Sequence, residues 1–176
     1  MKIIVLVDIQ NDFINGSLGS PEAQAIVPRV IDRIKKIDSD TIVYVTYDTH
    51  SDDYLETPEG KKLPVNHCIY GTFGWDMPLE LEKITKELKA RVFTKGTFGS
   101  VLLGEDLAWQ VDNHNIESIE IMGLCTDICV ISNALIIKAY CPDTPISVIA
   151  DCCAGVTPEK HEAALEVMRS CQIEVI

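Results

Sequence analysis

Apolar runs rich in β-branched residues recur along the chain and predict β-strands. They are Ile3–Val7, Thr41–Tyr47, Arg91–Thr94, Ser118–Met122, Ile146–Ala150 and Ile173–Ile176. The segments between them carry apolar residues at helical spacing and predict amphipathic helices at Glu22–Ile37, Leu79–Leu88, Gly104–His114, Thr126–Tyr140 and Pro158–Cys171. Strands that are apolar throughout need cover on both faces. We therefore predict an α/β fold, a three-layer α/β/α sandwich around a mostly parallel six-stranded sheet.

The composition is that of one globular domain. The chain has 176 residues, of which 47% are hydrophobic, and no linker, repeat or low-complexity tract divides it. A chain of this length can bury a sizeable core. We therefore expect a single domain that spans residues 1–176.

The net charge and the cysteine content limit the possible binding partners and the cellular compartment. The net charge of −12 argues against nucleic acid or an anionic membrane as a partner, because both need positive surface. No apolar run is long enough to cross a bilayer, and the first run breaks at Asp8 without a cleavage site, so we interpret it as a strand and not a signal peptide. The seven cysteines lie mostly in apolar stretches without a C-x-x-C pair, which favours a reducing, cytoplasmic setting. The expected partner is a small-molecule substrate, and a homo-oligomer is left open.

Three chemically active residues follow predicted strands. Asp8 comes after the first strand, Lys95 after the third, and Cys129 lies in the first turn of the helix after the fourth. Ligands of open α/β sheets bind beyond the carboxyl ends of the strands, so these side chains are expected to share one crevice. A thiol at a helix start faces unpaired N–H groups, which favour the thiolate and could hold an oxyanion. Asp8 would then accept the thiol proton, and Lys95 would lower the thiol pKa.

The alternatives without a catalytic role are a turn residue for Asp8 and a solvated surface lysine for Lys95. Asp12 is expected to be a turn residue of that kind, hydrogen-bonded to nearby N–H groups. His114 and His161 are expected on solvated helical surfaces.

A metal site is predicted beside this crevice. Asp48 and His50 alternate in an extended stretch, so both side chains point the same way, and His67 would return from the following loop. Imidazole and carboxylate ligands suit Zn²⁺, Mn²⁺ or Fe²⁺, and three ligands with open positions describe a catalytic site. Lone histidines are more often structural, so spacing alone leaves this open.

These residues resemble the nicotinamidase and isochorismatase-like superfamily of cysteine hydrolases over essentially the whole chain. The matching motifs are Asp8–Phe13, Asp48–His50, His67–Thr72, Lys95–Gly96 and Gly123–Val130. The resemblance implies the isochorismatase-like hydrolase fold and a catalytic triad of Asp8, Lys95 and Cys129. It also implies a cis peptide between Leu124 and Cys125, which would turn the Cys125 N–H toward that of Cys129 to complete an oxyanion hole.

The same resemblance extends to the metal and the substrate pocket. Asp48, His50 and His67 match metal ligands position by position. Glu59 resembles the carboxylate that some members use in place of a further histidine. Phe13 matches one aromatic wall of the pocket.

Leu124 is expected to contact the substrate beside the oxyanion hole. The Trp or Phe that commonly precedes the His67 motif is replaced by Leu63-Pro64, so Phe98, Tyr54 or Trp75 would supply the second ring.

The implied function is a metal-assisted cysteine amidohydrolase, most simply a zinc-dependent nicotinamidase of NAD salvage that forms a thioester on Cys129. One alternative is hydrolysis of another small amide or ureido compound, and a second is an isochorismatase-type reaction, against which the metal motif speaks. A remote alternative is a non-enzymatic receiver-like binding domain. That fold needs a phosphoacceptor Asp after the third strand, where this chain has Lys95.

Overall fold

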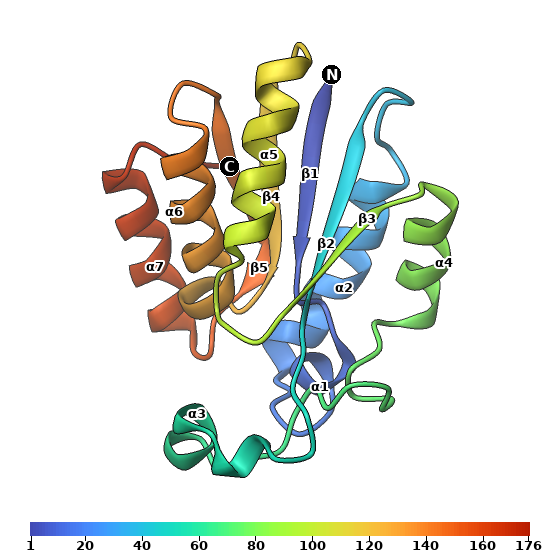
Figure 1. The fold of residues 1–176 in the computed structure, drawn as a ribbon, viewed down its shortest axis with the longest axis vertical. Helices are drawn as coiled ribbons and strands as arrows, with labels where there is room; N and C mark the ends of the chain where they lie inside the picture. Colours follow the sequence, from blue (N-terminus) through green and yellow to red (C-terminus); the bar gives the residue numbers. More distant parts are fainter.

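A computed structural model describes all residues, 1–176, and shows a six-stranded sheet between two layers of helices (Figure 1). All neighbouring strands pair in parallel, in the order β3-β2-β1-β4-β5-β6. The strands are β1 (Lys2–Val7), β2 (Ile42–Asp48), β3 (Arg91–Lys95), β4 (Ser118–Leu124), β5 (Ile146–Ala154) and β6 (Glu174–Val175). The predicted three-layer fold is thereby confirmed.

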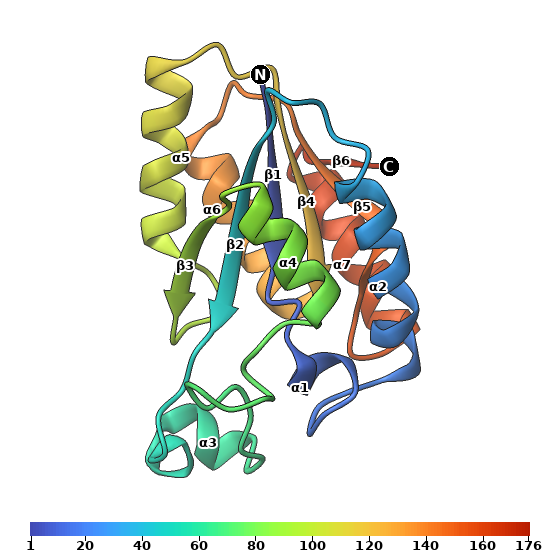
Figure 2. The same cartoon turned by 90° about the vertical axis from the view of Figure 1, so that its right-hand side faces the viewer.

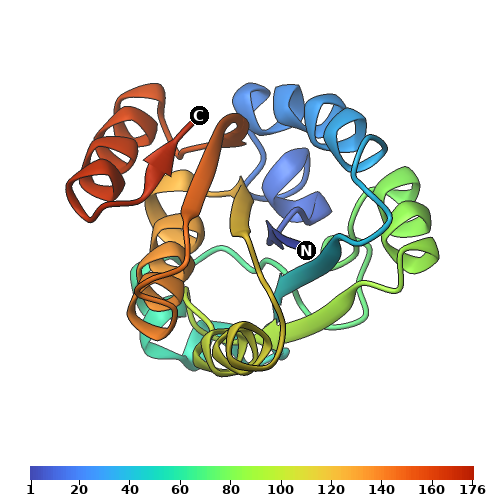
Figure 3. The same ribbon diagram turned by 90° about the horizontal axis from the view of Figure 1, so that it is seen from above.

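Helices cover both faces of this sheet (Figures 1 and 3). One layer contains α2 (Pro21–Ile34) and α4 (Leu79–Glu87), which Figure 2 shows nearest the viewer. The other contains α5 (Val101–Asn113), α6 (Ile131–Tyr140) and α7 (Pro158–Ser170). Because both faces are covered, the β1 residues Ile3–Val7 are almost fully buried, as their unbroken apolar run predicts. No helix in the fold combines the length and the hydropathy needed to span a bilayer.

The remaining elements gather at the carboxyl ends of the strands. They are α1 (Asn11–Ile14), a 3₁₀ turn η1 (Tyr54–Glu56), α3 (Pro58–Lys62) and a π-helical turn η2 (Thr126–Val130). Figure 1 shows α1 and α3 at the end of the sheet toward which the strand arrows point. The sequence patterns predicted no helix at α1, η1 or α3, and a single helix where η2 and α6 lie.

The strand order places a crevice between β1 and β4. The chain leaves β1 toward β2 on one side and returns to β4 on the other, so the order reverses at this pair. Such a switch point is where open α/β sheets bind ligands. Gly123 permits the close approach of the two strands there, because its φ is +136° and a Cβ would overlap the Val7 carbonyl.

The fifth strand is longer than its apolar run predicts. Its pairing with β4 shifts in register between Ile121 and Gly123, and β5 then continues alongside β4 as far as Ala154. Asp151, which follows the predicted strand Ile146–Ala150, therefore lies within β5. Its carbonyl accepts a hydrogen bond from Arg29 Nη1 at 3.1 Å, and its side chain lines a separate cavity under α2.

Candidate active site

The structure brings together the carboxylate, the ammonium and the thiol that follow three different strands. Lys95 Nζ lies 2.6 Å from Asp8 Oδ2 and 3.6 Å from Cys129 Sγ. All three residues are buried. Lys95 ends β3, two strands away from β1, and its long side chain crosses the end of β2 beside Asp48 to reach Asp8. The crevice therefore holds an ion pair in contact with a thiol.

Asp8 is held by its backbone and by one of its two oxygens. Its φ of +47° is in the left-handed region, which Asp tolerates better than most residues. The Thr46 hydroxyl donates to Asp8 Oδ1 at 2.6 Å, and the Asp8 N–H donates to the Thr46 carbonyl at 3.2 Å. Asp8 Oδ2 faces the Lys95 ammonium but has no hydrogen bond of good geometry. That oxygen is the one free to receive a proton.

The protonation states in this buried cluster follow from burial and charge. Burial raises the pKa of the Cys129 thiol, the negative charge of Asp8 raises it further, and Lys95 only partly offsets both. Burial also raises the pKa of Asp8, against the opposing charge of Lys95. For Lys95, burial would lower the pKa, but the charges of Asp8, Cys129 and Asp48 together raise it. Burial thus outweighs the helix-start effect expected from the sequence, and the resting nucleophile is a thiol that needs a base.

The turn that carries Cys129 is built by backbone and side-chain contacts. The Cys125 carbonyl accepts from the N–H groups of Ile128 at 3.0 Å and of Val130 at 3.1 Å, and the second bond makes the turn π-helical. The Leu124–Cys125 peptide is cis, as the family resemblance implies. The buried Asn133 of α6 donates to the Cys129 carbonyl at 2.8 Å. Asn133 therefore fixes the end of the turn, a role that no sequence motif indicated.

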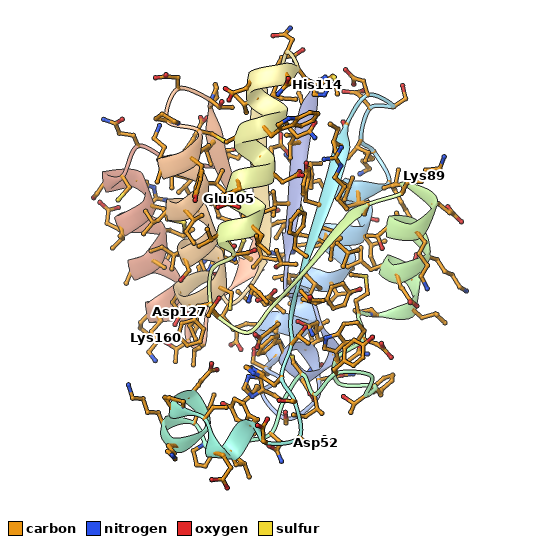
Figure 4. All side chains as sticks on the ribbon, in the orientation of Figure 1. Asp52, Lys89, Glu105, His114, Asp127 and Lys160 are labelled. Atoms are coloured by element: carbon orange, nitrogen blue, oxygen red, sulfur yellow. The ribbon has the colours of Figure 1, made fainter.

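The same turn is supported by the start of α7. Thr126, which is fully buried, makes a 2.7 Å hydrogen bond to His161 Nδ1, and Asp127 Oδ1 accepts from the Val156 N–H at 2.9 Å. His161 is thus engaged with the site-bearing turn, which differs from the solvated position expected for it. Figure 4 shows Asp127 and Lys160 at the end of the sheet that faces α3, opposite His114.

The four residues predicted to bind a metal also converge. Donor atoms of Asp48, His50 and His67 lie within 4.8 Å of one another. Asp48 Oδ2 is 3.1 Å from His50 Nε2 and 3.4 Å from His67 Nε2. Glu59 Oε1 lies 4.0 Å and 3.9 Å from the same two nitrogens. Because α3 carries Glu59, a short helix missed by pattern analysis positions the fourth candidate ligand.

The chemistry of this group fits a divalent cation. His67 Nδ1 is 2.9 Å from the Val65 carbonyl, so in the neutral ring this nitrogen carries the proton and Nε2 presents a lone pair. That lone pair faces the Asp48 carboxylate, and two acceptors face each other stably only with a cation or proton between them. Nitrogen and oxygen ligands in this number suit Zn²⁺, Mn²⁺ or Fe²⁺.

Gln10 joins the metal group to the loop after β1. This fully buried side chain donates to the Asp48 carbonyl at 2.8 Å and accepts from the Asp48 N–H at 2.8 Å. Its amide also donates to the Trp75 carbonyl at 2.9 Å. The two-point contact fixes the backbone of a candidate ligand, a role that was not predicted for Gln10.

A cavity of about 460 Å³ opens over the thiol and the metal group. It is lined by mainly apolar side chains, together with Asp48, Glu59, His67, Cys125 and Cys129. A ligand in this cavity would therefore contact the nucleophile and the metal group at once.

Two aromatic rings line this cavity. Phe13 takes the position expected from the resemblance, and Phe98 is the one of the three candidate second rings that reaches the cavity. Tyr54 instead packs behind the metal ligands, with ring centroids 4.6 Å from His50. Trp75 stacks on Tyr47 at 4.9 Å.

Leu124 does not take the expected place in the cavity wall. Its side chain is fully buried and belongs to the hydrophobic core. The next residue, Cys125, lines the cavity instead.

The chain is similar to known proteins along almost its whole length. Residues 2–176 match the family model described as the isochorismatase domain. The chain is 29% identical over 189 residues to the nicotinamidase/pyrazinamidase of Mycobacterium tuberculosis, covering 100% of this chain and 98% of that one. A nicotinamidase/pyrazinamidase structure from Bacillus subtilis matches with a TM-score of 0.81 at 29% identity, covering 99% of this chain and 98% of that one. The zinc complex of a Pyrococcus horikoshii pyrazinamidase gives 0.78 at 26% identity, covering 99% and 98%.

Proposed function

The chain belongs to the isochorismatase domain family, and from this premise we propose that it is a cysteine amidohydrolase of the nicotinamidase kind. Its substrate is a small amide, with nicotinamide as the first choice, and its products are the carboxylate and ammonia. The names of its relatives support this substrate class. The observation that carries the proposal is one cavity shared by the Cys129 thiol, with its Asp8–Lys95 ion pair, and by a metal-ligand group.

Acylation begins with the proton of the Cys129 thiol. Asp8 Oδ2, which lacks a good hydrogen bond, takes this proton while Lys95 stabilises the charges on both groups. The sulfur attacks the amide carbon, and the backbone N–H groups of Cys125 and Cys129 receive the oxyanion. Asp8 then returns the proton to the nitrogen as the C–N bond breaks. Ammonia leaves, and a thioester remains on Cys129.

Deacylation reverses these roles with water. Asp8 removes a proton from the water as its oxygen attacks the thioester carbon, and the C–S bond breaks. The proton passes back to the Cys129 sulfur, which restores the buried thiol. The product formed in this step is the carboxylic acid, which loses its remaining proton to solvent and leaves as the carboxylate. The negative charge of Asp8 favours its release.

The metal ligands in this proposal are Asp48, His50, His67 and Glu59. When bound, a divalent cation would act as a Lewis acid that polarises and orients the substrate in the cavity. The zinc in the Pyrococcus horikoshii pyrazinamidase structure favours Zn²⁺ as the ion here. Phe13 and Phe98 supply apolar ring faces for a flat substrate. A cytoplasmic role in NAD salvage, with all seven cysteines as free thiols, completes the proposal.

Hydrolysis of aromatic amides by the metal-loaded protein tests this function. Nicotinamide and pyrazinamide are expected to release ammonia, and an N-carbamoyl amino acid is expected to react much more slowly. Removing the metal with a chelator should lower the rate by roughly 100-fold or more, and Zn²⁺ should restore it. Ammonia release is measured by a coupled assay. Turnover of only the ureido compound, or turnover indifferent to the chelator, would contradict the proposal.

The pH dependence of kcat/KM provides a test of Asp8 as the base. Because burial raises the pKa of Asp8, the acid limb should lie above the ordinary carboxyl value of 3.8, with activity rising as the carboxylate forms. The Thr46 hydroxyl bond lowers this pKa. Thr46→Val should therefore move the limb upward by about one pH unit, the size expected for a hydrogen bond to a charged group. An acid limb at the same pH in both proteins would remove Asp8 from this role.

A further inference from the structure

We propose that Asp12 is a positioning residue of the metal centre, which it serves by holding the backbone of Cys68 and so directing the two histidine ligands. The proposal rests on the metal centre described above and adds a residue that is not one of its ligands. Asp12 lies in α1, on the loop that begins with the catalytic Asp8. It would tie the metal loop to the same short segment that supplies the base.

The contact between Asp12 and the metal loop is direct. The Cys68 N–H donates to Asp12 Oδ2 at 2.8 Å across 56 residues of sequence. The Asp12 N–H donates to the Gly74 carbonyl at 3.0 Å, so side chain and backbone hold the same loop at two points. A backbone N–H bonded to a carboxylate is a charge-assisted hydrogen bond, stronger than a neutral one.

Cys68 connects Asp12 to both histidines. It follows His67 directly, and its carbonyl accepts from the His50 N–H at 3.0 Å. Its φ of +46° is unusual for a residue other than glycine, and such a backbone persists only where its surroundings fix it. The Asp12 bond on one side of Cys68 and the His50 bond on the other supply that constraint. Without the first, the Cys68 backbone is free to relax and to carry both imidazole rings away from Asp48.

Two glycines border the Asp12 carboxylate. A Cβ built on Gly74 would overlap the Asp12 carboxylate, and a Cβ on Gly16 would overlap its Oδ1. Neither position has a φ in the left-handed region that alone would require glycine. At Gly16 a Cβ would also meet the Asp12 Cα at 2.7 Å, so the room that the carboxylate needs explains the missing side chain at Gly74 alone.

Zn²⁺ affinity, measured by competition with a chromophoric chelator, tests this role. Asp12→Ala should weaken Zn²⁺ binding about 10- to 100-fold, the range for residues that orient metal ligands. Asp12→Asn keeps an acceptor oxygen and should stay within about threefold of the parent. Gly74→Ala should reproduce the loss because it displaces the carboxylate, and the double variant should be no worse than either single one.

Asn11→Ala is the matched control. Asn11 Nδ2 donates to the Phe73 carbonyl at 2.8 Å, so this change loosens the same loop without touching Cys68. Its Zn²⁺ affinity should equal that of the parent even if its melting temperature falls. Equal losses in Asn11→Ala and Asp12→Ala, or parental affinity in Asp12→Ala, would overturn the proposal. Should Asp12→Ala fail to fold, Gly74→Ala carries the same comparison.

The outcomes separate this inference from the proposed function. A parent that binds Zn²⁺ but hydrolyses no amide contradicts the nicotinamidase proposal and leaves the role of Asp12 to be decided by the affinities. A parent that hydrolyses nicotinamide and binds no Zn²⁺ contradicts the metal centre and the role of Asp12 together.

Discussion

Cys129→Ala is expected to abolish amide hydrolysis, lowering kcat by a factor on the order of 10⁴ or more. The sulfur both contacts the buried Asp8–Lys95 pair and lines the cavity, and no other group at this position can form the acyl intermediate. The fold should survive, because the change replaces a small buried thiol by a methyl group. Ammonia release measures the activity, and thermal unfolding checks the fold. A variant with near-parental turnover would rule out the thioester mechanism.

Cys125→Ala is the matched control for this experiment. Cys125 lines the same cavity, but Lys95 donates to the sulfur of Cys129, and the mechanism uses only the backbone N–H of Cys125. The N–H remains when the side chain is shortened to a methyl group. We therefore expect Cys125→Ala to keep most of the activity, within about tenfold of the parent. Iodoacetamide should accordingly label Cys129 in the Cys125→Ala protein and leave no cavity thiol labelled in the double variant.

The architecture could be predicted because the strands are apolar on both faces. Ile3–Val7 shows this most clearly, since every residue is buried by helices that the sequence also predicts. The end of β5 could not be predicted, because Asp151–Ala154 joins the strand through a register shift against Gly123. That pairing depends on the backbone of a distant strand and leaves no local pattern. The segment with α3 is short and polar, so its helix was missed for the same lack of periodicity.

The reactive groups of the candidate site could be predicted from the sequence. The residues that hold the backbone around them were harder to predict. Asp8, Lys95 and Cys129 each follow an apolar strand, and parallel strands deliver such residues to one edge of the sheet. Gln10 acts through the distant backbone of Asp48, and Asn133 acts through the Cys129 carbonyl four residues earlier. Asp12 accepts from the nearby Ser17 N–H, as expected of a turn residue, and also from the distant Cys68 N–H. Polar residues in turns have many local uses, so their long-range partners appear only in three dimensions. The helix-start argument for a thiolate could not include burial, which raises the pKa of the Cys129 thiol and depends on the whole fold.

Removing the charge of Lys95 is expected to have a large effect on stability as well as on activity. Its ammonium is the only cation in contact with Asp8, which is fully buried. Lys95→Met keeps a long apolar stem but leaves the carboxylate without a counter-charge. We expect the free energy of unfolding to fall by about 3–5 kcal/mol, the cost of breaking a buried ion pair on one side. Amide hydrolysis should fall on the order of 10³-fold, because the charges that stabilise the reacting groups are lost.

The double variant Asp8→Asn/Lys95→Met separates these effects, because it removes the pair without leaving a buried charge. Urea unfolding should show most of the lost stability restored, while ammonia release stays absent. The single variant also carries a pH signature. Without Lys95, which lowers it, the pKa of Asp8 in the folded protein rises further above 3.8, so the folded state holds a proton that the unfolded state has released. Stability of Lys95→Met should therefore increase as the pH falls from neutrality toward 3.8, and the double variant should lack this increase. A single variant as stable as the parent at pH 7 would mean that the Asp8 carboxylate is compensated by some group other than Lys95.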